Sequence, residues 1–480
     1  MKHAISYLLF AAILLSAVGC GGDAGTSDTT TADSAAESTT SGDPRDSLPA
    51  LDMGGENFNI YLWEYTQMVS DEENGDIIND AVYRRNRAVE ELYNVNFEFT
   101  VRDGSSESRQ YPTWLSTLTA SVMAGDNSIQ LAGGYAYRLA LDSLNSYFHN
   151  LADVETLDFS QPWWWGQAME AADLGKKMFL CFGNVDPQNY NVVYTMYYNK
   201  RLAEGYSITD LYDLVLSGKW TMDKLIEYSA LAASDLNGDS KMDQNDQFGF
   251  LTGNNMEIDG FVAACDVPIT TRDADGIPQL VGLSEKYVDV QQKLNQFIRE
   301  SGTVLYGESW DMVEPFMNGQ GLFMAERIQV AHTMREMNDD FGILPYPKWD
   351  EAQKDYYTHV SCGNNTAFLI PNTANAEEAG AILNALCCYG YYDVMPEYIE
   401  RALKGKAARD EESAAILDII FDNISIEFTQ IYSFCFGNQA APSMMMRQTI
   451  KNNVEIASMW ESLKSSADET MKTLIESLTE

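Results

Sequence analysis

The sequence predicts an α/β protein built from two lobes or domains, and three observations lead to this prediction. Apolar and polar residues alternate over 56–65 and again over 94–101, as is typical of strands. A helical pattern lies between them, which indicates a strand–helix–strand unit and hence a parallel sheet. Residues 51–480 are also too many for one compact core, so we expect the chain to divide.

Each element is predicted by a local pattern. In the first strand Phe58, Ile60 and Leu62 alternate with polar neighbours. Over 77–93 the apolar residues recur at spacings of three and four, with Asp76 available as the helix cap. Further elements are expected in this order: a helix over 114–123, a strand near 129–134, helical turns near Ala140, a continuous strand over 190–200, a helix over 220–234 opened by Thr221, a strand over 247–253, and helices from Ala376 to the C-terminus.

The N-terminus is typical of an exported protein. Lys2 precedes an apolar stretch over 7–18, and small residues lead to Cys20, so 1–19 is predicted to be a secretory signal and not a membrane span. The site before Cys20 resembles the lipobox of bacterial lipoproteins, although Ala17 stands where that motif more often has Leu. Cys20 is therefore the expected lipid attachment site, with an ordinary signal peptide cleaved nearby as the alternative.

Residues 20–50 are predicted to form a flexible, lipid-anchored linker, because they are almost entirely Ser, Thr, Asp, Gly and Ala. A coil of this length spans roughly 30 Å on average. We therefore expect a folded body held at the cell membrane through its lipid alone, on the extracellular face or the periplasmic side.

The charge of the chain narrows the class of partner. The chain has 71 acidic against 31 basic residues, a net charge of −40, which argues against nucleic acid and anionic lipid surfaces as partners.

Besides Cys20 there are six cysteines, an even number that permits three bridges, but their spacing matches no compact disulfide framework. Mostly buried free thiols are the prediction, in a chain that we expect to be a monomer.

Five strings in this order resemble the extracellular solute-binding proteins of family 1, the sugar-binding class of ATP-driven importers to which the maltose-binding protein belongs. They are TMYYNKRL, the W-T-x-D-x-L pattern from Trp220, NGQGLFMAE, FGILPYPKWDEAQKDYY and NTAFLIPNTANAEEAGAILNAL. The resemblance implies a two-lobed periplasmic-binding-protein-like fold of type II, with discontinuous lobes joined by a hinge. By this analogy the first lobe holds 51–192 plus 320–362, and the second holds 193–319 plus 363–480.

The resemblance also implies a function. Such proteins capture a carbohydrate in the cleft between the lobes, close around it, and deliver it to the permease of an ABC transporter. An oligosaccharide is the favoured ligand. A peptide or another polar solute is the alternative within binding proteins, and a secreted glycan hydrolase is the rival of another class. No catalytic motif is recognisable, so no enzyme activity and no organic cofactor are expected.

Sugar binding needs flat aromatic surfaces and polar groups that hydrogen-bond hydroxyls. Aromatic residues follow two predicted strands, at the ends where α/β proteins usually bind ligands. A tryptophan triplet follows Pro162, and we expect at least one of its members near solvent. For every single aromatic residue the competing interpretation is core packing, and for Arg327 it is a surface salt bridge. The predicted ligand-binding residues are Trp63, Glu64, Tyr65, Tyr135, Trp163, Trp164, Trp165 and Arg327.

Residues 235–246 have the spacing of a calcium-binding loop. The predicted ligands are Asp235, Asn237, Asp239, the backbone carbonyl of Lys241, Asp243 and Asp246. Two features depart from the usual loop, because Ser240 stands where Gly is expected and the last ligand is Asp instead of Glu. A single structural calcium ion is the prediction, in a helix–loop–strand setting, with a plain acidic turn as the alternative.

Overall fold

The computed structural model describes residues 43–175, 177–308, 311–403 and 411–476. Residues 44–480 group into one compact unit. The predicted signal 1–19, the predicted lipid site Cys20 and the linker up to residue 42 lie outside the described residues. No helix in the described part of the chain is long and apolar enough to span a membrane.

The first sheet has the strand order β12-β3-β1-β2. β1 (Glu56–Trp63), β2 (Val95–Arg102) and β3 (Leu131–Tyr135) are parallel, and β12 (Thr366–Leu369) runs antiparallel to β3. Helix α1 (Ile77–Tyr93) connects β1 to β2, so the predicted strand–helix–strand unit is confirmed. The predicted cap is confirmed as well, because the Asp76 carboxylate accepts hydrogen bonds from the backbone N–H groups of Ile78 and Asn79.

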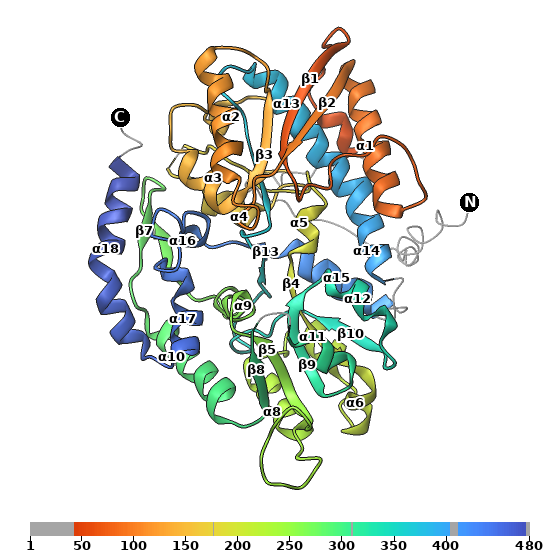
Figure 1. Cartoon of the computed structure of the whole chain (residues 1–480), viewed down its shortest axis with the longest axis vertical. Helices are drawn as coiled ribbons and strands as arrows, with labels where there is room; N and C mark the ends of the chain where they lie inside the picture. Colours follow the sequence, from red (N-terminus) through yellow and green to blue (C-terminus); the bar gives the residue numbers. More distant parts are fainter. Residues whose placement is uncertain (1–42, 176, 309–310, 404–410, 477–480) are drawn as a thin grey trace, which may run out of the picture. The chain divides into compact units, whose positions relative to one another are not determined.

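The second sheet has the order β10-β4-β9-β5-β8. β5 (Phe248–Gly253) is parallel to β8 (Val304–Gly307) and β9 (Gly321–Arg327), whereas β4 (Tyr194–Asn199) is antiparallel to β9 and to β10 (Phe341–Leu344). The strand predicted over 190–200 begins only at Tyr194, since Gln188–Asn191 form the short helix α5. Figure 1 shows the two sheets in separate halves of the view.

Helices and short strands cover these sheets and link them. The remaining helices are α2 (Tyr111–Ala124), α3 (Ala136–Asp142), α4 (Gly166–Ala172), α6 (Lys200–Gly205), α7 (Leu211–Leu216), α8 (Met222–Ala232), α9 (Met256–Ala264), α10 (Glu285–Asn295), α11 (Val313–Met317), α12 (Val330–Thr333), α13 (Ala376–Tyr389), α14 (Met395–Leu403), α15 (Glu411–Asp422), α16 (Phe428–Ile431), α17 (Met445–Asn452) and α18 (Ile456–Glu476). Two-stranded pairs are formed by β6 (Thr270–Arg272) with β7 (Pro278–Leu280) and by β11 (Thr358–His359) with β13 (Ile424–Ser425). The 3-10 segments are η1 (Pro44–Ser47), η2 (Leu151–Asp153), η4 (Met334–Glu336) and η6 (Pro442–Met444), and the π-helical segments are η3 (Gln296–Glu300) and η5 (Gly390–Val394).

The strand pairing differs from the lobe boundaries that the resemblance suggested. β9 belongs to the second sheet, although 320–362 was assigned to the first lobe, and β12 belongs to the first sheet, although 363–480 was assigned to the second. The physical reason is that each strand continues the hydrogen-bond ladder of its sheet. β9 lies between β4 and β5, and β12 pairs along β3.

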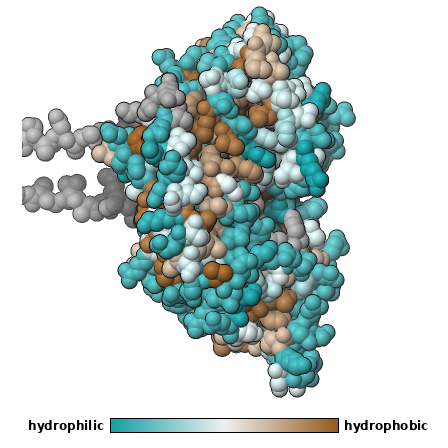
Figure 2. All heavy atoms as spheres, turned by 60° about the vertical axis from the view of Figure 1, so that its left-hand side comes forward, coloured by the Kyte–Doolittle hydropathy of each residue, from teal (hydrophilic) through white to brown (hydrophobic). Residues whose placement is uncertain are grey.

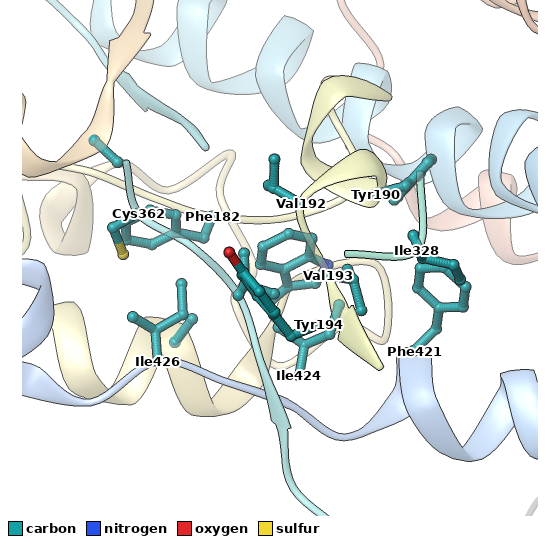
Figure 3. Close-up of a cluster of buried hydrophobic side chains, with 14 of the residues drawn as sticks. Phe182, Tyr190, Val192, Val193, Tyr194, Ile328, Cys362, Phe421, Ile424 and Ile426 are labelled. Atoms are coloured by element: carbon teal, nitrogen blue, oxygen red, sulfur yellow. The ribbon is translucent and has the colours of Figure 1, made fainter. Parts of the chain in front are cut away.

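The chain passes between the sheets at a buried apolar crossing. Val193 forms a bridge with Val360, the N–H of Ile328 donates to the carbonyl of Val193, and the N–H of Ser361 donates to the carbonyl of Val192. Figure 3 shows the side chains of this region packed together, with Val192, Val193, Ile328 and Cys362 among them. Three segments that connect the sheets are therefore joined at one place.

The folded part of the chain begins at a lower residue number than the composition predicted. Residues 44–50 were predicted to be flexible linker, but Pro44–Ser47 form η1. The Arg45 guanidinium lies 2.5 Å from the Asp393 carboxylate and over the rings of Tyr389 and Tyr392, at 5.0 and 5.4 Å from their centroids. These partners are more than 340 residues away, so composition alone could not reveal the docking.

All six cysteines of the described residues are free thiols, as predicted, and all but Cys435 are buried. The surface is strongly polar. Figure 2 shows one face of the molecule, on which hydrophilic residues predominate and hydrophobic residues are confined to limited patches. This is the surface expected of a chain with a net charge of −40.

Candidate ligand-binding site

The candidate site lies where the parallel strands of the two sheets end. The carboxyl ends of β1 and β3 carry Tyr65 and Tyr135, and those of β5 and β9 carry Asn255 and Arg327. Contacts across the crossing segment 361–365 bring these ends together. The Ser361 hydroxyl lies 2.6 Å from the Met256 sulfur, and a Cβ on Gly363 would lie 2.9 Å from Met256 and 3.5 Å from Tyr137. Open α/β sheets usually bind ligands at this position.

Five aromatic rings gather at the ends of β1 and β3, and we call them the aromatic cluster: Trp63, Tyr65, Tyr135, Tyr137 and Phe434. Trp63 stacks on Tyr135 with the ring centroids 5.8 Å apart, and Tyr65 meets Trp63 edge-on at 5.2 Å. Trp63, Tyr135 and Tyr137 are buried, whereas Tyr65 and Phe434 are partly exposed. The structure therefore brings together three of the predicted aromatic residues and leaves the Tyr65 and Phe434 rings partly exposed, with the Arg138 guanidinium 4.3 Å from the centroid of the Phe434 ring.

Trp63 is held at the base of the aromatic cluster by a chain of hydrogen bonds. Its indole N–H donates to the Thr366 hydroxyl over 2.9 Å, and that hydroxyl donates to the Asp186 carboxylate over 2.8 Å. Since Trp63 is fully buried, it is positioned to support the rings above it.

Glu64 has a role in the adjoining loop. Its carboxylate accepts hydrogen bonds from the backbone N–H groups of Gly104 at 2.6 Å and Ser105 at 3.1 Å. Burial alone would raise the pKa of Glu64, but the hydrogen bonds from Ser105 and Gly104 outweigh it and hold the pKa below its ordinary value. The ionised carboxylate thus fixes the loop that follows β2, and its predicted contact with a ligand stays a prediction.

The tryptophan triplet packs elsewhere. Trp163 donates from its indole N–H to the Asn384 amide oxygen on α13 over 2.8 Å, and the Trp164 ring lies 5.0 Å from that of Phe159. All three tryptophans are buried, so the expectation that at least one lies near solvent is wrong. The neighbouring Gly183 makes this packing possible, because a Cβ there would lie 2.6 Å from the sulfur of Cys387 and 2.9 Å from Trp164. A ligand role for Trp163, Trp164 and Trp165 stays a prediction.

Buried charged side chains from α9, β9 and α17 gather near the carboxyl ends of β5 and β9. We call Glu257, Asp259, Glu326, Arg327 and Arg447 the charged cluster. The Nε of Arg327 lies 3.4 Å from the Glu326 carboxylate, and a guanidinium nitrogen of Arg447 lies 3.1 Å from that of Asp259. The competing interpretation for Arg327, a surface salt bridge, is therefore wrong in its location, since both partners are buried, and the predicted ligand role of Arg327 stays a prediction.

The two carboxyl groups that pair with arginines, those of Asp259 and Glu326, have raised pKa values. Burial raises the pKa of Asp259 to about 7 against the opposing charge of Arg447. Burial, together with the negative charge of Glu257, raises the pKa of Glu326 to about 7. Both carboxyl groups therefore titrate close to neutral pH.

Several buried polar groups near this position have no hydrogen-bond partner among the described residues. They include the Tyr137 hydroxyl, both polar atoms of the Asn365 amide, and the carboxylate oxygens of Asp259, whose contact with Arg447 is an ion pair. Leaving a buried polar atom without a partner costs about 1–3 kcal/mol. Hydroxyl groups of a ligand could supply the missing hydrogen bonds.

The predicted calcium loop connects α8 to β5, as the helix–loop–strand prediction requires. The Asp235 carboxylate accepts from the N–H groups of Gly238 at 2.6 Å and Ser240 at 2.7 Å, and the buried Asp246 accepts from Leu236 and Asp243. Ser240 has a φ of 64°, the left-handed conformation for which the usual loop has Gly. Within the described residues, no three His, Cys, Asp or Glu side chains form a group ready to hold a metal ion. Calcium binding stays a prediction.

Calcium is expected to raise the melting temperature of the wild-type protein, because an ion that binds only the native state stabilises it by about 2.7 kcal/mol at one hundred times its dissociation constant. Asp239→Ala should abolish the increase with little effect otherwise, since this carboxylate accepts only from the nearby Lys241 N–H. Thermal unfolding with calcium and with EDTA measures this. Asp273→Ala, in the turn between β6 and β7, is the control, and an identical response of wild type and Asp239→Ala would contradict calcium binding.

Comparison with solved structures shows the fold: the chain has the two-lobed fold of periplasmic binding proteins, as predicted. A cyclo/maltodextrin-binding protein in complex with maltotetraose aligns with a TM-score of 0.55 at 13% identity, over 87% of this chain and 97% of that one. A sugar transporter from Rhizobium etli in an open conformation aligns at 0.54 and 13%, over 87% and 99%. The apo form of RafE from Streptococcus pneumoniae aligns at 0.53 and 13%, over 87% and 98%. No family model and no curated protein matches the sequence.

Proposed function

We propose that this chain is an extracellular solute-binding lipoprotein of family 1, which captures a carbohydrate between its lobes and delivers it to an ABC transporter permease. The observation that carries the proposal is the candidate site itself. Two partly exposed aromatic rings, Tyr65 and Phe434, lie in one cluster with Tyr137, whose buried hydroxyl has no partner among the described residues. Flat apolar surfaces beside free hydrogen-bonding groups match the two chemical faces of a sugar ring.

The structural neighbours support this proposal. One aligned protein is a cyclo/maltodextrin-binding protein that holds maltotetraose and another is a sugar transporter, and both share the fold across most of the present chain. A binding protein among these neighbours agrees with a role without catalysis. An oligosaccharide remains the favoured ligand, with Cys20 as the site of the lipid that keeps the protein, as a monomer, at the membrane.

The proposed mechanism uses the crossing between the sheets as a hinge. Val193, Ile328 and Val360 join the connecting segments at one place, so small backbone rotations there would open or close the space between the two sets of strand ends around a sugar (Figure 3). The aromatic cluster would stack on the ring faces, and Arg327 and Asn364 would approach from the opposite side. The Asn364 amide oxygen accepts a hydrogen bond from the Arg327 guanidinium over 3.2 Å. The permease would then recognise the closed form.

The alternative of a peptide or another polar solute has one observation in its favour, which is the charged cluster. Its carboxyls and guanidiniums are largely paired with each other, however, so few of these charges are left for a charged ligand. A screen of sugars and peptides by calorimetry distinguishes the two, and release of shortened glycans during the screen would favour a hydrolase instead.

Replacing Tyr65 with alanine is expected to weaken sugar binding about 10-fold or more, equivalent to about 1.4 kcal/mol, because the ring is accessible and supported by Trp63. Isothermal titration calorimetry with maltotetraose and raffinose measures the change. Tyr83→Ala on the outer face of α1 is the control and should bind as wild type does. Equal affinity of all three proteins would remove the aromatic cluster from the site.

A further inference from the structure

The hairpin formed by β6 and β7 belongs to the half of the molecule that contains the second sheet. β6 follows α9, which packs on β5, and β7 packs on α18 and leads into α10. The two strands pair from Thr270 with Leu280 to Arg272 with Pro278. In Figure 1, β7 extends from the level of α10 to the level of α4. The hairpin is therefore attached beside the second sheet and extends beyond it.

Helix α4 and the loop after it belong to the other half, which contains the first sheet. The sulfur of Met169 on α4 accepts a hydrogen bond from the N–H of Phe182 over 3.1 Å, and the adjacent Cys181 forms a bridge with Phe368 of β12. β12 is a strand of the first sheet. A contact between the β6–β7 hairpin and α4 therefore joins the two halves.

Arg272 of β6 makes such a contact. Its guanidinium donates to the backbone carbonyls of Glu170 and Asp173 at the C-terminal end of α4, to the latter over 2.8 Å. It also donates to the carbonyl of Gly276 in the hairpin turn over 2.6 Å, which holds the side chain in this orientation. The carbonyls at the C-terminal end of a helix carry partial negative charge, so a guanidinium is a favourable partner for them.

A second contact is apolar. Ile277 near the tip of the hairpin lies so close to Gly175, in the loop after α4, that a Cβ on this glycine would overlap the Ile277 side chain. Gly175 has a φ of 80°, in the left-handed region that favours glycine. Ile277 is half-buried, so its packing on this loop removes apolar surface from water. The glycine thus allows the two halves to approach closely.

A third contact lies at the start of the hairpin. The Thr270 hydroxyl donates to the Glu427 carboxylate over 2.9 Å. Glu427 is the N-cap of α16, which packs on α3 and α4 of the other half. The hairpin therefore contacts the first-sheet half along its length, from Thr270 to Ile277.

The hairpin also borders the space between the two halves, in which the proposed function places the sugar. A cavity of about 750 Å³ lies there, and Glu170 of α4 and Arg272 and Pro278 of the hairpin are among the residues that line it. The halves are joined elsewhere by the buried crossing at Val193 and Val360. For the halves to separate at the edge of α4, the hairpin must release this helix.

We propose that the β6–β7 hairpin is a latch, which holds the two halves together before a sugar binds and sets how readily they separate. The latch rests on the contacts of Arg272, Ile277 and Thr270, whereas its effect on sugar capture rests on the proposed function. Without these contacts the halves would lie apart more often, and sugar binding would have to supply the free energy of closure.

Small-angle X-ray scattering of the purified, sugar-free protein tests the latch. Arg272→Ala and Ile277→Ala should each increase the radius of gyration, because each removes contacts that exist only while the halves lie together. Arg299→Ala is the matched control, since it removes an exposed arginine that lies over the Tyr306 ring within the second-sheet half, and it should scatter as wild type does. Circular dichroism verifies that each variant is folded.

Titration of the same proteins with maltotetraose and raffinose separates the latch from the proposed function. Arg272→Ala should bind sugar about 10-fold more weakly than wild type, since the apparent Kd rises as the closed population falls. Equal radii of gyration for wild type, Arg272→Ala and Ile277→Ala overturn the latch, whatever their sugar affinities. Larger radii with unchanged affinity support the latch and remove its effect on capture. Larger radii, together with failure of wild type to bind either sugar at millimolar concentration, support the latch and contradict the proposed function.

Discussion

Replacing Asp186 with alanine is expected to lower the free energy of unfolding by about 3–5 kcal/mol, as the loss of one partner from a buried charged network does. Asp186 is fully buried, and its carboxylate accepts four hydrogen bonds of 2.8–3.0 Å from Thr66, Gln67, Gln188 and Thr366. The substitution leaves all four donors unsatisfied. It also removes the negative charge that offsets buried Arg85, whose pKa burial lowers to about 10.

Urea denaturation measures this loss. Asp158→Ala is the control, because that carboxylate lies at the surface and accepts only from its near neighbours Ser160 and Gln161. The control should change the stability by well under 1 kcal/mol. If both variants unfold at the same urea concentration as wild type, the Asp186 network does not stabilise the fold.

The stability of the protein is expected to fall as the pH rises from 5 to 7. Asp259 and Glu326 have native pKa values of about 7, whereas in the unfolded chain they ionise near pH 4, so within this window the native state holds more protons than the unfolded state. Each carboxyl then contributes a loss of about 1.4 kcal/mol per pH unit. His359 acts in the opposite direction below pH 6.5, because its native pKa of about 3 keeps it neutral while the unfolded chain takes up a proton. The raised pKa values of the buried carboxyls Asp186 and Glu427 act in the same direction as those of Asp259 and Glu326, so the net effect is a fall in stability.

Two variants should change the pH dependence of the stability in opposite directions. Thermal unfolding followed by calorimetry between pH 5 and 7 measures the effect of each variant. Glu326→Gln removes one of these carboxyls and should make the fall of the melting temperature with pH shallower. His359→Gln removes the opposing histidine and should make the fall steeper. If the melting temperature of the wild type rises with pH, and that of Glu326→Gln rises in the same way, these carboxyls are ionised in the native state.

Local patterns were sufficient to predict the first sheet and its helices. The alternation at Phe58, Ile60 and Leu62 and the cap at Asp76 depend only on neighbouring residues, and both predictions are confirmed by the structure. The same reasoning placed the start of β4 too early. The sequence pattern over 190–193 is compatible with a strand and equally with the short helix α5 that ends there. A fully buried segment has no polar face that distinguishes the two.

The candidate site was only partly predictable, because it is assembled from distant segments. Trp63, Tyr65 and Tyr135 could be proposed since each lies at or just after the end of a recognisable strand. Phe434 and Arg447 reach the site from the C-terminal region, next to Tyr135 and Asn255, and no local spacing signals these contacts. The tryptophan triplet shows the converse error, since nothing in its sequence reveals the covering helix α13 or the space left by Gly183.

The docking of Arg45 against Asp393, Tyr389 and Tyr392 has a mechanical consequence. η1 packs on α13, and α13 packs on α1, which connects β1 to β2 of the first sheet. A force applied to the chain at Pro44 would therefore reach the first sheet before the second. In the proposed lipoprotein, the half that contains β5 and β9 would be the half that moves on ligand capture.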